Sequence, residues 1–342
     1  MQALVRALFE PAADAHPDGT IGAELELIPV RDHTGRRVGI DSGADGVGSA
    51  EIIRTSTLSE AWKETTDPYG APNWLAPDAS RISFEPGGQV EISSRVFRSP
   101  QQLAQSLADT VGALRESAAA HGVTLLTLGV DPYNEIDEVA LELHAPRYES
   151  MTRYFDSIGP SGARMMRQTA SLQVSIELGA KPMQRWALLN ALAPYLVAAY
   201  ANSPDYARRP VGYASYRSHL WQTLDHSRTG LPFDANDPIG AYERFARGAS
   251  RILGADAAHL TTLFPEIRPR GFFEIRSMDA MEPGRLETAL RFIHGIVHDC
   301  DTATEARRIV GEPDAAMLAR AARQGRSDPE IAERLDALER LV

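Results

Sequence analysis

Four segments of the chain alternate between polar and apolar residues with a period of two, which predicts strands whose two faces differ. They lie near residues 20–30, 81–94, 171–177 and 271–276. In each, one face is apolar and the other carries carboxylates, amides or a guanidinium. The residues of the polar faces are, in chain order, Glu24, Glu26, Glu85, Gln89, Glu91, Gln173, Ser175, Glu177, Glu274 and Arg276. The pattern therefore predicts a sheet with one apolar face and one face rich in glutamate.

Other segments predict helices. Ser99 and Pro100 are a typical N-cap and first helical residue, and Gly122 can end the helix that follows. An apolar helix is expected over residues 182–201, and helical periodicity continues from about residue 282 to the end of the chain. Because strands and helices do not alternate regularly, the expected class is α+β with a largely antiparallel sheet.

The glutamate-rich face carries the main chemical signal. Glu24, Glu26, Glu85, Glu91 and Glu274 have few lysines near them, so their carboxylates would repel one another across a sheet. Neighbouring carboxylates raise each other's pKa unless a cation offsets the repulsion, and Mg²⁺ prefers oxygen ligands. We therefore expect a magnesium site, and a solvated strand face is the alternative. Zinc is disfavoured because the chain has no pair of cysteines.

Composition narrows the class of protein. The chain has 342 residues, a hydrophobic content of 43% and a net charge of −11, which argues against a nucleic-acid partner. Cys300 is the only cysteine, so no intrachain disulfide can form and a cytoplasmic location is expected. No run approaches the roughly 20 apolar residues of a spanning helix, so no membrane association is expected.

The motifs together resemble the glutamate–cysteine ligase family of the plant and proteobacterial type, which includes actinobacterial members that open ergothioneine biosynthesis. The most specific motifs are Glu-Pro-Gly-Gly-Gln-Val-Glu at residues 85–91 and Thr-Thr-Leu-Phe-Pro-Glu at residues 261–266. Further matching segments lie at residues 21–26, 165–176, 201–204, 215–221, 225–233 and 274–276. They occur in family order and span roughly residues 21–280.

The resemblance implies a glutamine-synthetase-like catalytic fold, in which a curved antiparallel sheet packed by helices forms a funnel for ATP and Mg²⁺. It implies one catalytic domain over residues 1–342, with a helical C-terminal portion at about 282–342. The implied reaction joins the γ-carboxylate of L-glutamate to the amino group of L-cysteine through a γ-glutamyl phosphate. The expected partners are these small molecules, and the protein is expected to be a monomer or a homodimer.

The resemblance also implies roles for individual residues. Six of them would be metal ligands or their immediate surroundings: Glu24, Glu26, Glu85, Glu91, Gln173 and Glu274. Arg276 would lie beside the transferring phosphoryl group. Separately, the reaction needs an acceptor for the amine proton, and a carboxylate such as Glu91 is the candidate. The substrate-binding residues would be Arg217, Tyr216, Trp221 and Gln89.

Some positions depart from the family pattern and leave the acceptor open. Arg276-Ser277-Met278-Asp279 stands where Arg-Gly-x-Asp is more usual, and the segments at 208–210 and 213–214 also differ from plant members. The alternatives are therefore a γ-glutamyl ligase that uses another amine, in a natural-product pathway, and a catalytically silent relative that binds glutamate or nucleotide. The single cysteine also excludes the disulfide-based redox control associated with plant members.

Overall fold

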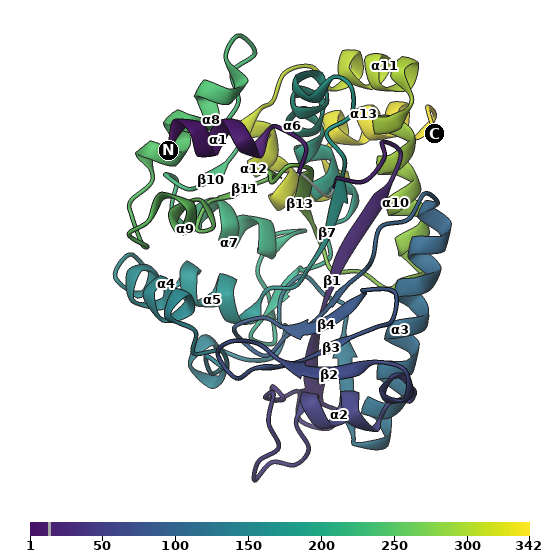
Figure 1. The fold of residues 1–342 in the computed structure, drawn as a ribbon, viewed down its shortest axis with the longest axis vertical. Coiled ribbons are helices and arrows are strands. Elements are labelled where there is room, and N and C mark those ends of the chain that lie inside the picture. The colour runs from purple at the N-terminus through teal and green to yellow at the C-terminus, as the bar shows by residue number, and fades with distance from the viewer. Residues whose placement is uncertain (13–14) are drawn as a thin grey trace.

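The computed structural model describes residues 1–12 and 15–342, and a large sheet lies at its centre (Figure 1). Its strands follow the order β12-β13-β7-β1-β5-β4-β3-β2, and β6 pairs with the far end of β1. Every strand pairing described in this sheet is antiparallel. The strands are β1 (Ile21–Arg31), β2 (Lys63–Thr66), β3 (Pro72–Leu75), β4 (Arg81–Phe84), β5 (Val90–Ser93), β6 (Val123–Leu126), β7 (Ser171–Ile176), β12 (Ile267–Pro269) and β13 (Phe273–Asp279).

Helices lie on both sides of the strands, with α3 and α10 on one side and α4, α5 and α7 on the other in Figure 1. Two small sheets pair β8 (Asp205–Tyr206) with β9 (Arg209–Pro210), and β10 (Thr229–Gly230) with β11 (Phe264–Pro265). The helices are α1 (Gln2–Leu8), α2 (Ser49–Thr55), α3 (Pro100–Ala120), α4 (Pro146–Asp156), α5 (Ser161–Gln168), α6 (Pro182–Ala199), α7 (Tyr216–Leu224), α8 (Pro238–Gly248), α9 (Asp256–Leu260), α10 (Pro283–His298), α11 (Cys300–Val310), α12 (Ala315–Gln324) and α13 (Pro329–Glu339). Short 3₁₀ turns lie at Thr57–Glu60, Ile136–Glu138 and Gly325–Ser327.

Strand β1 is the centre of the molecule because it is buried on both faces. Leu25 and Leu27 are fully buried in the main apolar core, which they share with residues of α3, α6 and α10. Glu26 points the other way and is only 7% exposed, so the second face is covered as well. The alternation that predicts two unlike faces is confirmed, and the glutamate face turns out to be an interior.

The predicted helix after Ser99 is confirmed. It spans Pro100–Ala120, and the Ser99 side chain accepts a hydrogen bond from the amide of Gln102 at 3.3 Å. Gly122 follows with φ of 64°, a conformation that glycine adopts without strain. The predicted helix at 182–201 is α6, and the chain beyond 282 forms α10 to α13.

The single strand expected over residues 81–94 is wrong. The structure has two antiparallel strands there, β4 and β5, which pair Phe84 with Val90 around a tight turn. Pro86 has no amide hydrogen to donate to a ladder, and Gly88 has φ of 79°, so the sequence turns instead of extending. Glu85 and Gln89 therefore face each other across the turn, where the Glu85 amide donates to the Gln89 carbonyl at 2.9 Å.

The predicted class, α+β with a largely antiparallel sheet, is confirmed. Within the described ranges, none of the helices combines the length and the apolar character that crossing a bilayer requires.

Candidate active site

Three carboxylates from three elements meet above the glutamate face of the sheet. Glu26 lies on β1, Glu91 lies opposite it on β5, and Glu85 begins the turn between β4 and β5. One carboxylate oxygen from each lies within 4.8 Å of the other two. Three oxygen ligands at this spacing can hold one hard divalent cation. The sequence predicted all three as metal ligands, and the fold brings them together.

The electrostatics of these carboxylates and of Glu24 suit a divalent cation. Burial, followed by repulsion from Glu91, raises the pKa of Glu26 to about 7. Burial, Glu91 and Glu26 together raise the pKa of Glu85 well above its ordinary value. Burial, Glu91 and Glu274 raise the pKa of Glu24 to about 8. Without a cation the site therefore retains protons at neutral pH, and a divalent ion would replace them. The donor set thus fits Mg²⁺.

Neutral donors orient these carboxylates without cancelling their charge. Glu26 accepts from the amide and the hydroxyl of Ser171 at 2.8 and 3.0 Å, and from Gln173 Nε2 at 3.1 Å. Glu91 accepts from the hydroxyls of Ser83 and Ser93 at 2.9 and 3.1 Å. Because these donors come from β7, β4 and β5, the sheet itself fixes the carboxylates.

Glu274 lies in a different electrostatic environment. Its carboxylate contacts the guanidinium groups of Arg268 at 2.7 Å, Arg270 at 2.8 Å and Arg276. Although burial disfavours its charged form, Arg268, Arg276 and Arg270 hold the pKa of Glu274 below its ordinary range. Glu274 therefore anchors a cluster of arginines, and its role as a metal ligand stays a prediction.

Arg217 and Arg276 share a wall of the site with Trp221. The Arg276 guanidinium lies 5.3 Å from the centre of the Trp221 ring, and that of Arg217 lies 5.8 Å from it. Two contacts hold the Arg217 guanidinium in place. Its Nη2 donates to the Arg276 carbonyl at 2.8 Å, and its Nη1 lies 3.8 Å from the Asp279 carboxylate. These arginines offer positive charge opposite the glutamates.

A cavity of about 140 Å³ joins the carboxylates to the arginines. Nine of the predicted site residues line it, namely Glu24, Glu26, Glu85, Gln89, Glu91, Gln173, Arg217, Trp221 and Arg276. Glu24 also borders a second cavity of about 220 Å³, whose wall includes Gly22, Ala23, Ser94 and Ser175. The sheet thus presents two adjoining cavities with Glu24 between them.

The side chains of two predicted substrate-binding residues, Tyr216 and Gln89, are engaged in contacts within the protein. Tyr216 does not line the cavity: its ring packs against Tyr206 and Tyr213, at 5.5 and 6.1 Å between centres. Consecutive helical residues point about 100° apart, and here Tyr216 packs into a small apolar cluster with Val130 and Leu220 while Arg217 lines the cavity. Gln89 lines the cavity, but its side chain bonds the Gly87 amide at 3.0 Å and the Thr169 carbonyl at 2.8 Å.

The sequence reasoning missed other lining residues. Arg268 and Arg147 add positive charge, while Tyr148, Met151, Met165 and Met166 form an apolar part of the wall. Arg268 lies directly opposite Glu274 in the pairing of β12 with β13. The Arg-Pro-Arg-Gly sequence at residues 268–271 indicates a turn between two strands, and this turn is the signal that could have predicted the pairing. Arg147 and Tyr148 come from α4, and no local pattern connects them to the sheet.

Comparison with known proteins decides the family. The sequence model described as glutamate-cysteine ligase family 2 (GCS2) matches residues 20–337. The chain belongs to this family. A similar relative is the glutamate–cysteine ligase EgtA of Mycolicibacterium smegmatis, with 30% identity over 88% of this chain and 82% of the relative. The chloroplastic glutamate–cysteine ligase of Arabidopsis thaliana is 27% identical over 65% of this chain, which spans about half (49%) of that relative.

Solved structures support the fold of the GCS2 chain. A bifunctional glutathione synthetase from Pasteurella multocida superimposes with a TM-score of 0.54 at 12% identity, covering 99% of this chain and 46% of that one. The glutamate–cysteine ligase of Francisella tularensis, solved in complex with AMP, gives 0.51 at 12% identity over 94% of this chain and 78% of that one. The predicted family and the glutamine-synthetase-like fold are therefore confirmed, and the protein is a ligase of the GCS2 family.

Proposed function

We propose that this GCS2 ligase forms γ-glutamylcysteine from L-glutamate and L-cysteine at the expense of ATP. The observation that carries the proposal is one cavity in which Glu26, Glu85 and Glu91 face Arg217 and Arg276. Transfer of a phosphoryl group needs divalent cations on one side and fixed positive charge around the reacting oxygens. A substrate carboxylate also needs a cationic partner, which the arginines supply.

The carboxylates are proposed to hold the metal. Glu26, Glu85 and Glu91 would be direct ligands, with Glu24 and Gln173 beside them. Bound there, Mg²⁺ would neutralise and orient the phosphates of ATP. The second cavity, beyond Glu24, includes small residues such as Gly22 and Ser175 in its wall and is our proposed place for the remainder of the nucleotide.

The arginines are proposed to hold the reacting oxygens. Arg217 binds the glutamate substrate, and Arg276 lies beside the phosphoryl group. An oxygen of the γ-carboxylate attacks the terminal phosphorus of ATP, the bond to the bridging oxygen breaks, and ADP leaves. The acceptor nitrogen then attacks the carbonyl carbon, phosphate leaves, and Glu91 accepts the proton that the nitrogen releases.

Cysteine as the acceptor agrees with the apolar part of the wall. Met151, Met165 and Met166 are uncharged and polarizable, which suits a small side chain that ends in sulfur. A charged acceptor side chain would lose its hydration beside these methionines, and only an acidic one would have a partner in the same wall, Arg147. The methionines thus favour small, uncharged acceptors.

We also propose that residues 1–342 act as one catalytic domain. The C-terminal helix α12 contacts the N-terminus of α7, because the amides of Ala214 and Ser215 donate to the carbonyls of Arg323 and Ala322 at 3.1 and 2.9 Å. Since α7 carries Arg217, the helical C-terminal portion supports the substrate site.

Product identification tests this function. The purified protein is given ATP, Mg²⁺, glutamate and an equimolar mixture of cysteine, serine, alanine and glycine, and the products are identified by mass spectrometry. We expect γ-glutamylcysteine to dominate, together with ADP. A different γ-glutamyl product would move the assignment to a ligase with another acceptor, and no product or ADP with any acceptor would favour a silent relative.

A further inference from the structure

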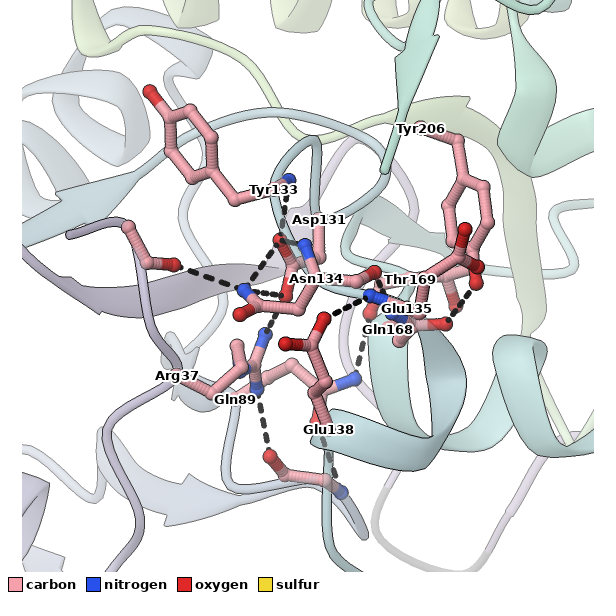
Figure 2. Close-up of polar contacts among 12 residues, drawn as sticks. Arg37, Gln89, Asp131, Tyr133, Asn134, Glu135, Glu138, Gln168, Thr169 and Tyr206 are labelled. Atoms are coloured by element: carbon pink, nitrogen blue, oxygen red, sulfur yellow. Dashed lines mark hydrogen bonds and ion pairs between the residues drawn. The ribbon is translucent and has the colours of Figure 1, made fainter. Parts of the chain in front are cut away.

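The turn that carries Glu85 is held from outside the sheet by buried polar residues far away in sequence (Figure 2). The turn joins β4 to β5 and has two backbone hydrogen bonds of its own, from the Glu85 amide to the Gln89 carbonyl at 2.9 Å and from the Gly88 amide to the Glu85 carbonyl at 2.8 Å. Both bonds lie within the turn, so they do not tie it to the rest of the protein. Its position, and that of the carboxylate at its start, depends on what surrounds it.

Arg37 provides one of these surrounding contacts. Its Nη2 donates to the carbonyl of Gly87 at 2.6 Å. The Arg37 side chain is 5% exposed, and its Nη1 lies 3.7 Å from the carboxylate of Asp131, which is fully buried. Asp131 in turn accepts from Asn134 Nδ2 at 2.9 Å. Figure 2 shows Arg37 between this Asp131–Asn134 pair and the turn.

Arg37 itself is tied to the strand that bears Glu26. The amide of Val38 donates to the carbonyl of Pro29 at 3.0 Å, and Pro29 belongs to β1. The Arg37 side chain therefore connects the main chain of β1 to the turn that presents Glu85. Two of the three clustered carboxylates are linked through this one guanidinium.

Further contacts complete the support of the turn. The Glu142 amide donates to the Pro86 carbonyl at 2.7 Å, and Gln89 bonds both the Gly87 amide and the Thr169 carbonyl. Gly87 leaves no spare room, since a β-carbon there would lie 2.2 Å from the Arg167 carbonyl oxygen. The turn is thus confined between segments near residues 37, 142 and 167–169.

Burying Arg37 is a poor way to stabilise the fold. Removing a guanidinium from water costs several kcal/mol, and an apolar side chain of similar volume is often as stable or more so. Within the described residues, Nε and Nη1 of Arg37 make no hydrogen bond, so the Nη2 bond to Gly87 and the 3.7 Å ion pair with Asp131 are what offset that cost. A geometric role explains why an arginine occupies the position.

We propose that Arg37 is a positioning residue, which places Glu85 against Glu26 and Glu91 by holding the Gly87 carbonyl. The inference rests on the proposed metal site. Outer partners of metal ligands typically change metal affinity by about 10- to 100-fold when they are removed. Arg37 does not line the cavity, so it would act on the metal site through the turn.

The test measures metal binding and not turnover. Mn²⁺, which electron paramagnetic resonance detects directly, is titrated into the unmodified protein and into Arg37→Met, Arg37→Lys and Arg115→Met. Arg115 is the matched control because it also donates to a main-chain carbonyl, that of Leu125 at 3.2 Å, and pairs with Glu282 away from the cavity. Circular dichroism and the melting temperature report on the fold of each variant.

We expect Arg37→Met to weaken Mn²⁺ binding by about 10-fold or more, Arg37→Lys to weaken it less, and Arg115→Met to leave it unchanged. Unaltered Mn²⁺ affinity in a folded Arg37→Met would overturn the inference. If Arg37→Met does not fold, Arg37→Lys decides by the same criterion. Absence of Mn²⁺ binding to the unmodified protein would instead refute the proposed metal site, which is a separate outcome.

Discussion

Glu26 and Glu274 are both buried carboxylates on the same sheet, yet their pKa values move in opposite directions. Burial, followed by repulsion from Glu91, raises the pKa of Glu26 to about 7, although its hydroxyl and amide donors act against the rise. Glu274 is surrounded by guanidinium groups, so its pKa falls. Glu274 thus has its counterions within the protein, whereas the electrostatics of Glu26 suit our proposed metal site. This difference, and not burial alone, is why we propose Glu26 and not Glu274 as a direct metal ligand.

The raised pKa of Glu26 predicts how stability depends on pH. A group whose pKa is raised in the folded state stabilises the fold below its unfolded pKa, near 4.5, and loses that contribution as pH rises through the folded value, about 7. In EDTA, the free energy of unfolding should therefore fall by about 1–3 kcal/mol between pH 5 and pH 8. Saturating Mg²⁺ should stabilise the protein more at pH 8 than at pH 5.

Thermal unfolding in EDTA and in Mg²⁺ across this range checks the prediction. Glu26→Gln, which cannot ionise, is the control and should show a weaker pH dependence than the unmodified protein. Equal dependence in both proteins would mean that Glu26 does not titrate as described.

Glu85 gives the most direct functional prediction. Glu85→Gln removes one charged ligand while keeping the shape of the side chain, so we expect turnover to fall by about 100-fold or more. Because the pKa of Glu85 is raised well above its ordinary value without metal, the change replaces one neutral side chain by another, so the melting temperature without metal should not fall. Steady-state release of ADP and a thermal melt measure the two effects. Turnover close to that of the unmodified protein would remove Glu85 from the metal site.

Elements with a local signal were predictable from sequence, and those defined by tertiary contacts were not. The faces of β1 follow from alternation, and the start of α3 follows from Ser99 and Pro100. The turn at 86–88 was missed because the alternating residues on either side suggested one continuous strand. Arg37, by contrast, lies in a loop, and only the folded chain brings its side chain to Gly87.

Helix α3 allows a prediction at the scale of a single element. Gly112 is exposed in the middle of this helix, and a β-carbon there would meet nothing within 4 Å. Gly112→Ala should raise the free energy of unfolding by about 0.5–1 kcal/mol, because alanine loses less backbone entropy in a helix. Urea unfolding measures the change, and activity should be unaffected. A destabilised variant would show that the position is not as open as described.

At the scale of the whole molecule, segments from most of the chain build the site. Glu26 and Arg276 are separated by 250 positions in sequence, yet Gln173 of β7 contacts both. The family resemblance predicted which residues belong together, although it placed Tyr216 with Arg217 where the helix turns them apart. The methionines in the wall of the cavity could not be predicted from the sequence, because no sequence pattern distinguishes a methionine that lines a cavity from one that packs in a core.

Cys300 provides a test that concerns the molecule as a whole. It is exposed at the first turn of α11 and lines neither of the two cavities at the sheet. Cys300→Ser should therefore keep kcat/KM within about twofold, as expected of a surface substitution. Pretreatment with an oxidant, followed by its removal, should leave the activity of both proteins similar. A large loss confined to the unmodified protein would reveal thiol-based control.

Strand β1 is buried on both faces, and this affects which amino-acid substitutions the protein tolerates at successive positions of the strand. Substitutions at Leu25 and Leu27 act on folding, and so on the amount of protein a cell accumulates. By the proposed function, conservative substitutions of Glu24 and Glu26, such as glutamine, change the chemistry more than the fold. A screen for protein amount alone would tolerate substitutions of the two glutamates. Only a screen for the reaction product would eliminate them. Alternate residues of β1 are therefore constrained separately, by the abundance of the protein on one face and by its enzymatic activity on the other.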